Sequence, residues 1–325
     1  VGAAFGLYSF GSRSQSIYLS RLEGDASGLR ARAIYQRYNQ IARTYDLPRI
    51  NLAQLSFSND RNAVQWLSER PAVPFVLRGT PEWLRVVFPD DSSRFAGLYP
   101  RILKTEDIPR EILSRAEALS LAPGRNVFIL KGPFSGQYLA VEYQPEGVTI
   151  PGEPEELARH SLAWFGAALR SDLPRVSSRK KFSMAAERER AVRAEAWFEA
   201  SKIDGLWKSR TAQGVAYYFL GTLSLLEGQA TGFFQPRALA LSLDWYRKAA
   251  SCFSANNDAS FYAAVFNNAA LALLFSGTEQ ANLRKARYWL TEALRARPSE
   301  SSGPVLGVRV ALFNLMALEE AVPLR

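Results

Sequence analysis

The sequence predicts an α+β protein in which a small mixed α/β sheet domain is followed by an all-α domain of helical hairpins. Three observations support this fold class. Short strand and helix patterns alternate through the first half, strand patterns disappear from Pro154 onward, and two segments of the second half repeat one spacing of large and small residues. With 325 residues the chain is long enough for two domains. We expect them at 1–150 and 151–325, with a basic connector at 174–190.

The first half alternates short strands with amphipathic helices. Phe5–Phe10 is an apolar run between glycines, and the helix that follows buries Ile34, Tyr38, Ile41 and Tyr45 at steps of three and four residues. The pattern then predicts a strand at 50–57, a helix that begins at Asn59 or Asp60, and a strand at 72–79. This order of strands and helices predicts a largely parallel sheet.

Two hairpins complete the first domain. The segment 82–88 turns back beside the preceding strand, and a second pair of strands, NVFILK and QYLAVEY, flanks the turn sequence GPFSG. A short helix at 108–119 precedes this second pair. We expect the six strands to form one mixed sheet.

The order of elements from Phe5 to Phe88 resembles the N-terminal domain of TolB and the related FlgO-like envelope domains. The resemblance is carried by GLYSF, by the Ile34–Tyr45 helix and by PFVLRG. It implies a bacterial envelope location, which we favour over the cytoplasm. A generic small α/β domain is the alternative interpretation.

The second half contains a repeated helical pattern. Tyr217, Leu220, Gly221, Ser224 and Gly228 occupy offsets that Phe266, Ala269, Ala270, Leu273 and Gly277 repeat. Each set is followed by a partner segment, first with Ser242, Tyr246 and Ala249, then with Ala286, Leu290 and Ala293, before Pro298. The residues at 308–315 suit a capping helix.

This pattern resembles tetratricopeptide repeats, which are stacked helical hairpins. The resemblance implies that eight residues pack the hairpins, namely Tyr217, Gly221, Tyr246, Ala249, Phe266, Ala270, Leu290 and Ala293, and that Pro298 closes the second one. Tyr217 and Phe266 stand where tryptophan is commonest, and the loop 228–237 is enlarged. A weaker pair within 162–201 has similar offsets, and an irregular helical bundle remains the alternative.

The amino-acid composition excludes most of the common kinds of catalytic site. One Cys and one His exclude disulfide frameworks, zinc clusters and most triads that need an imidazole base. We therefore expect no enzyme, cofactor, metal site or small-molecule substrate. No run approaches the ~20 apolar residues of a membrane-spanning helix.

The leading hypothesis is a non-enzymatic interaction protein whose helical domain docks a protein partner, in a bacterial envelope assembly. Phe233 and Phe234 are the candidate contact residues, because adjacent aromatic residues in an enlarged loop cannot both enter one helical core. The alternative is an adaptor for nucleic acid or anionic membranes, which the net charge of +9 and the cluster Arg179, Lys180 and Lys181 favour. An enzyme using carboxylates in the first domain is the third hypothesis.

Overall fold

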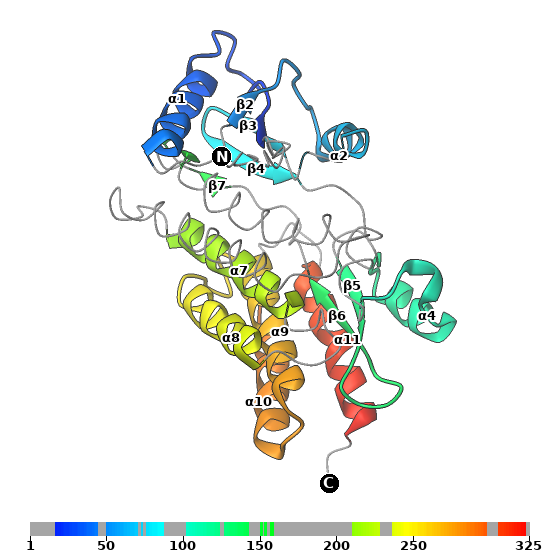
Figure 1. Cartoon of the computed structure of the whole chain (residues 1–325). Coiled ribbons are helices and arrows are strands. Elements are labelled where there is room, and N and C mark those ends of the chain that lie inside the picture. Colours follow the sequence, from blue (N-terminus) through cyan, green and yellow to red (C-terminus); the bar gives the residue numbers. More distant parts are fainter. Residues whose placement is uncertain are drawn as a thin grey trace, which may run out of the picture. The chain divides into compact units, whose positions relative to one another are not determined.

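The structure, a computed structural model, describes residues 17–44, 50–70, 73, 76–87, 102–123, 127–142, 150–151, 153–154, 157–158, 210–227, 236–297 and 305–322 (Figure 1). The chain forms two compact units. Unit 1 comprises 1–89 and 151–161, and unit 2 comprises 90–150 and 162–325. The segment 90–150, which the sequence analysis groups with the first domain, is therefore part of the unit that holds the helices.

Unit 1 is built on a mixed sheet. Its strands are β1 (Ile17–Leu19), β2 (Ile50–Leu52), β3 (Val76–Thr80), β4 (Trp83–Val87) and β7 (Ile150–Pro151), in the order β2-β1-β3-β4-β7. β1 is parallel to β2 and β3, and β3 forms an antiparallel hairpin with β4. The expected parallel core and hairpin are therefore present. The predicted strand Phe5–Phe10 lies outside the described residues, and the short strand β1 was not predicted.

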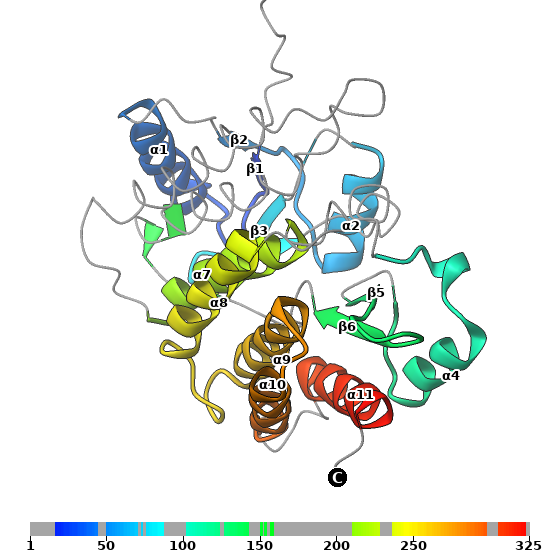
Figure 2. The same cartoon turned by 60° about the horizontal axis from the view of Figure 1, so that its bottom comes forward.

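Two amphipathic helices pack on this sheet, α1 (Leu29–Thr44) and α2 (Asp60–Ser68). Asn59 caps α2, because its side chain accepts a hydrogen bond from the N–H of Asn62 at 2.9 Å. The predicted stripe of α1 is buried at Ile34, Tyr38 and Ile41. Figure 2 shows the two helices on either side of β1–β3, so that both faces of these strands are covered.

Unit 2 contains a separate two-stranded sheet. β5 (Val127–Lys131) and β6 (Tyr138–Glu142) form the second predicted hairpin, with Gly136 at φ +71° in its turn. The expectation of one six-stranded sheet is wrong, because this hairpin packs with helices of unit 2. Its core joins Ile108, which follows the 3₁₀ turn η1 (Thr105–Asp107), to α4 (Arg110–Ala118) and the last helix through buried side chains that include Ile112, Ile129 and Phe313.

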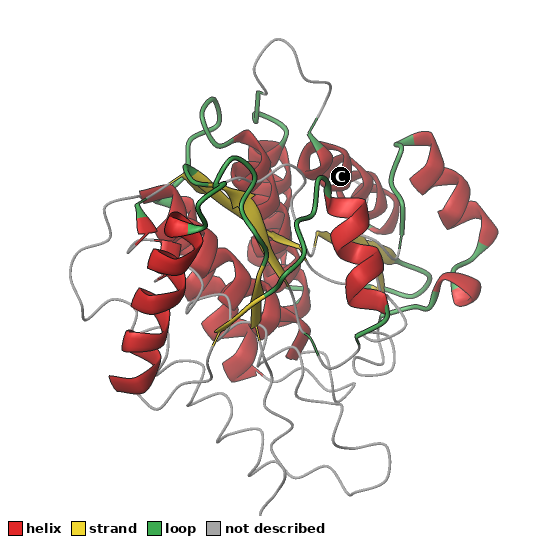
Figure 3. Ribbon diagram, turned by 90° about the horizontal axis from the view of Figure 1, so that it is seen from above, coloured by secondary structure: helices red, strands yellow, loops and turns green. Residues whose placement is uncertain are grey.

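Five further helices complete the described part of unit 2: α7 (Arg210–Glu227), α8 (Pro236–Ala250), α9 (Ala259–Ser276), α10 (Gln280–Ala293) and α11 (Leu306–Ala321). α7 packs on α8, and α9 packs on α8, α10 and α11. Figure 1 shows α11 beside the β5–β6 hairpin, and Figure 3, in which helices are red and strands yellow, shows that most of the regular structure in the described chain is helical. The coarse fold, a small mixed sheet followed by a mostly helical half, agrees with the predicted α+β class.

One helix in the described part of the chain, α9, is long and apolar enough to cross a membrane by length and composition. The sequence analysis did not single it out. In the structure 78% of its 18-residue window is buried inside the protein. A helix at the centre of a helical core has the same composition, so this property carries little weight as evidence for a membrane.

Candidate functional site

The outer edge of β6 is bound by asparagine side chains from α9 and α11. β5 pairs with one edge of β6, so the main-chain groups of Ala140 and Glu142 point away from the hairpin. Asn314 accepts a hydrogen bond from the N–H of Ala140 and donates one to its carbonyl, both at 2.6 Å. Asn268 makes the same pair of contacts with Glu142, at 3.2 Å and 2.7 Å. The two carboxamides therefore take the place of a neighbouring strand.

Further side chains extend this arrangement along β6. Asn267 donates to the carbonyl of Ala140 at 3.4 Å, and the Tyr218 hydroxyl donates to the carbonyl of Glu142. The asparagines also bind one another, since Asn314 donates to Asn267 at 2.8 Å and Asn267 donates to Asn268 at 3.0 Å. All of these residues are buried. A connected network of this kind satisfies polar groups that would otherwise destabilise the core.

Three of these side chains occupy corresponding positions on alternate helices of the series α7–α11. Each follows a large aromatic residue and precedes a small residue by three positions. The three sets are Tyr217, Tyr218 and Gly221 on α7, then Phe266, Asn267 and Ala270 on α9, then Phe313, Asn314 and Ala317 on α11. The same register on three helices thus places one polar side chain each against a single strand.

Burial sets the electrostatics of this site. The pKa of the Tyr218 hydroxyl is raised well above its ordinary value, first by burial and then by the neighbouring Glu142 carboxylate. Burial also raises the pKa of Tyr246, whose hydroxyl donates to Thr222 at 2.9 Å. The Glu142 side chain is fully buried, and the absence of a side chain at Gly307 leaves room for it, because a Cβ there would lie 2.8 Å from Glu142 Oε2.

The predicted packing residues can be located for both hairpins. Gly221 lies against the ring of Tyr246, and a Cβ at residue 221 would come within 2.8 Å of two ring carbons. Tyr217 stacks on Trp245 at 5.6 Å, with the Lys248 amine 4.5 Å from the Trp245 ring centre. The other predicted members of the two hairpins, Ala249, Ala270, Leu290 and Ala293, are fully buried. Phe266 is only partly buried and contacts Tyr262.

The other predicted residues cannot be placed. Phe233, Phe234, Arg179, Lys180, Lys181 and Pro298 lie outside the described residues, as does the weaker pair within 162–201. The candidate contact loop and the basic cluster therefore remain predictions from the sequence.

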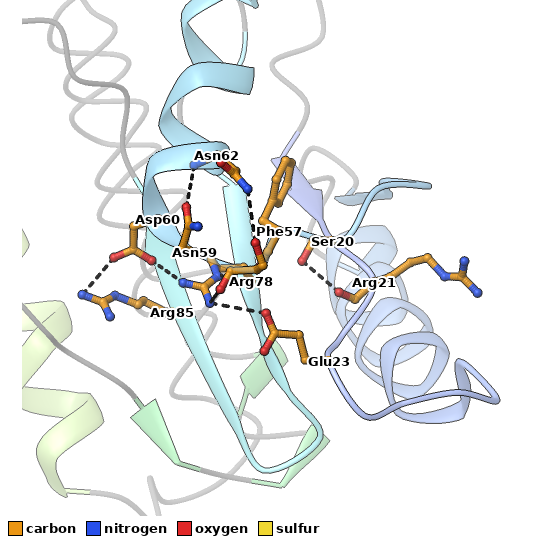
Figure 4. A network of polar contacts seen from close by, with 10 residues as sticks. Ser20, Arg21, Glu23, Phe57, Asn59, Asp60, Asn62, Arg78 and Arg85 are labelled. Carbon is orange, nitrogen blue, oxygen red and sulfur yellow. Dashed lines mark hydrogen bonds and ion pairs between the residues drawn. The ribbon is translucent and has the colours of Figure 1, made fainter.

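Unit 1 holds a second polar cluster, at the carboxyl ends of its parallel strands (Figure 4). Arg78 donates to the carbonyls of Phe57 and Ser58 at 3.1 Å and 3.3 Å. It also pairs with Asp60 and, at 3.6 Å, with Glu23. These contacts fasten the segments after β1 and β2 to β3. The buried guanidinium of Arg78 therefore has a hydrogen bond or an ion pair with each of these segments, as expected of a residue that holds them together.

A second arginine shares the same carboxylate. Arg85 lies directly opposite Arg78 in the β3–β4 register and pairs with Asp60 Oδ2 at 2.9 Å. Two like charges at directly opposed positions repel each other. Asp60 offsets this repulsion by offering one oxygen to each arginine.

Neither cluster has the ligand set of a metal site within the described ranges. No group of three or more His, Cys, Asp or Glu side chains in those ranges could hold a metal ion. Carboxamides offer donors and acceptors but no nucleophile or general base near neutral pH. In the structure these carboxamides bind the main chain of β6 itself. Comparison with known proteins finds no matching family model, no matching curated protein and no matching solved structure.

The sequence analysis missed the asparagines of this face. A signal was present, because Asn267 and Asn268 interrupt a largely apolar stretch of 18 residues, and Asn314 lies within LFNLMAL. Polar residues inside an apolar helix must find hydrogen-bond partners. Asn39 on α1 shows the same behaviour in unit 1, where it bonds both the N–H and the carbonyl of Ile50 on β2.

Proposed function

We propose that this chain is a non-enzymatic protein-interaction scaffold whose helical unit docks a protein partner in a bacterial envelope assembly. The proposal extends to the tetratricopeptide-like character of the hairpins α7–α8 and α9–α10. Stacked helical pairs bury their apolar stripes against neighbours and present extended surfaces on which partners bind.

The observation that carries this proposal is the shared register of α7, α9 and α11. Tyr218, Asn267 and Asn314 follow the large aromatic residue of each helix by one position, and all three contact the main chain of β6. In an irregular helical bundle, nothing would bring equivalent positions of three helices to the same strand. A repeated packing unit accounts for this agreement, and for the tryptophans Trp245 and Trp289, each of which precedes the large residue of its second helix.

The occupied face of α7, α9 and α11 limits where a partner binds. Since β6 already uses the hydrogen-bonding groups of this face, a partner contacts other surfaces unless it displaces the hairpin. The segment that carries Phe233 and Phe234 lies between α7 and α8 in the sequence and is the proposed contact segment. Adjacent aromatic residues are frequent anchors of protein interfaces.

The test is quantitative chemical cross-linking of the full chain in the cells that make it, followed by mass spectrometry. We expect a reproducible protein partner for the natural sequence and its loss in the double variant Phe233→Ala, Phe234→Ala. Phe134→Ala provides the control, because Phe134 lies in the β5–β6 turn of the same unit. If the natural chain cross-links to no other protein, or the double variant retains the partner fully, the proposal fails.

A further inference from the structure

The outer face of α10 carries an exposed tyrosine beside two cations. Tyr288 is 58% exposed, and the exposed residues Arg284 and Lys285 lie one turn before it on the same side of the helix. Thr291, one turn after Tyr288, is also exposed. Tyrosine and arginine are enriched among the residues that anchor protein interfaces. This face therefore offers an anchor residue together with charge.

The charges on this face do not cancel. Its carboxylate is Glu292, one turn after Tyr288, which pairs with Arg295 at 2.9 Å. Glu292 also accepts a hydrogen bond from the Tyr262 hydroxyl. Among the described residues, none forms an ion pair with Arg284 or Lys285. These two cations are therefore an uncompensated positive charge beside the tyrosine.

The other carboxylates near α10 leave this excess in place. Glu319 of α11 pairs with Arg287, which lies at the side of α10 rather than on the face of Tyr288. Glu279 caps the start of α10 and accepts a hydrogen bond from Asn282 at 3.0 Å. It precedes Tyr288 by two and a half turns, which places it on the opposite side of the helix.

The corresponding face of α8 has a different character. Aligning Tyr246 with Leu290 puts Asp244 at the position of Tyr288. Asp244 pairs with Arg247 at 3.0 Å, and both side chains are exposed. Balanced charges of this kind are typical of a solvated helix face. The exposed aromatic residue with unpaired cations distinguishes α10 from its counterpart.

We infer that the outer face of α10 binds an acidic segment of a protein partner. Two carboxylates of that segment pair with Arg284 and Lys285, and the segment covers the ring of Tyr288. Opposite charges across an interface attract and orient the partner, which is why an acidic segment fits. This inference rests on the proposed function and names the chemistry of the partner's binding element.

A short acidic segment fits this face better than a nucleic acid. The uncompensated charge of Arg284 and Lys285 occupies a single turn, which is about 5.4 Å of the helix axis. A nucleic acid presents a continuous row of phosphates, and proteins bind it by neutralising several of them. Glu292 lies on the same side only two turns after Arg284, where it would face that row.

The experiment uses the full chain with a photo-cross-linking amino acid, p-benzoylphenylalanine, in place of Ala281 or of Thr291. Both are exposed, and they lie on either side of Tyr288 along the helix. Ala240 and Asp244, exposed on α8, provide control positions. Adducts formed in the producing cells are mapped by mass spectrometry. We expect both test positions to reach one segment of a different protein that contains at least two Asp or Glu residues, and the controls not to reach it.

Charge reversal tests the cations. Arg284→Glu combined with Lys285→Glu lowers the yield of the adduct from position 291 by about tenfold, since close charge pairs at an interface contribute on that order. The matched control, Lys104→Glu with Arg110→Glu, changes exposed cations elsewhere in unit 2 and leaves the yield unchanged. Thermal unfolding of each variant checks the fold, and Arg284→Gln with Lys285→Gln removes the charges if the reversed pair fails to fold.

The tyrosine is tested separately. Tyr288→Ala removes the ring and lowers the yield of the same adduct by about tenfold, the usual effect of truncating an anchor residue. Tyr288→Phe keeps the ring and retains the adduct. An equal loss for both substitutions assigns the effect to the hydroxyl and overturns the role of the ring.

Four further outcomes overturn the inference: no adduct at 281 and 291, adducts to a second copy of this chain, adducts to a segment without clustered Asp or Glu, or an adduct that charge reversal leaves unchanged. Binding of the purified chain to a DNA or RNA oligonucleotide that charge reversal abolishes also overturns it, in favour of nucleic acid. If adducts are absent but the partner that depends on Phe233 and Phe234 remains, the inference fails while the proposed function stands. If no partner exists at all, both fail.

Discussion

Asn314 binds both main-chain groups of Ala140, accepting from its N–H and donating to its carbonyl at 2.6 Å. This is the pairing that an adjacent β-strand would supply to the edge of β6. An unpaired strand edge invites association with other chains. The asparagine therefore completes the hairpin and at the same time fixes it to α11.

Replacing Asn314 with leucine should destabilise the protein by about 2–4 kcal/mol, because the buried N–H of Ala140 loses its hydrogen bond to Asn314, Asn267 Oδ1 loses its bond from Asn314, and the carbonyl of Ala140 keeps only the 3.4 Å bond from Asn267. Asn314→Asp keeps the acceptor and loses the donor, so it should also destabilise. Urea unfolding measures both losses. Asn256→Leu, at an exposed position, is the control and should change the stability by less than about 0.5 kcal/mol. A loss below about 1 kcal/mol for Asn314→Leu would contradict this role.

Removing the carboxylate of Asp60 should weaken unit 1. Asp60→Asn leaves the arginines Arg78 and Arg85 facing each other without a shared counter-charge, and Arg78 is 7% exposed. A broken buried pair costs about 3–5 kcal/mol, and the partial exposure of Asp60 lowers our expectation to about 2 kcal/mol.

A second substitution separates repulsion from general damage at this site. Arg85→Gln in the Asp60→Asn background removes one of the two like charges and should recover part of the loss. Chemical denaturation followed by tryptophan fluorescence, to which Trp66 and Trp83 of this unit contribute, reports the change. No recovery in the double variant would rule out like-charge repulsion as the cause.

Alkaline pH should destabilise the protein through its buried tyrosines. Burial raises the folded-state pKa of Tyr38, Tyr218 and Tyr246 above the ordinary value of 10.0. As the pH rises through ~10, the unfolded chain releases these protons while the folded chain keeps them, so stability falls. Tyrosinate absorbance should therefore rise for these residues together with unfolding. If these tyrosines ionised while the protein stayed folded, that result would contradict their burial in the folded chain.

Much of the fold could be predicted from local patterns. The helix cap at Asn59, the amphipathic stripe of α1 and the β3–β4 and β5–β6 hairpins all follow from spacing over a few residues. These features depend on local backbone preferences. The grouping of the strands does not, because hydrogen-bond partners far apart in the sequence decide it. For that reason the β5–β6 hairpin was predicted to join the wrong sheet.

The strand β1 was not predicted, because its three residues, which have polar neighbours, are too few to show alternation.

The candidate site was harder to predict. The residues Asn267, Asn268 and Asn314 bind main-chain groups of Ala140 and Glu142, more than 120 residues away, and a main-chain partner leaves no mark on the sequence of the strand. The sequence did indicate the small positions Gly221 and Ala270, because helix packing depends on side-chain size at a fixed period.

The proposed common packing of the hairpins α7–α8 and α9–α10 is tested most directly by a double-mutant cycle. Gly221→Ala should destabilise by about 1 kcal/mol, because the steric overlap with Tyr246 costs about 1–3 kcal/mol and the helix preference of alanine returns about 1 kcal/mol. Tyr246→Leu with Gly221→Ala recreates the pair that the second hairpin has at Ala270 and Leu290. Urea unfolding of both single variants and the double variant should show that Gly221→Ala loses its cost in the Tyr246→Leu background, a coupling of about 1 kcal/mol or more. Additive losses would contradict the repeated arrangement.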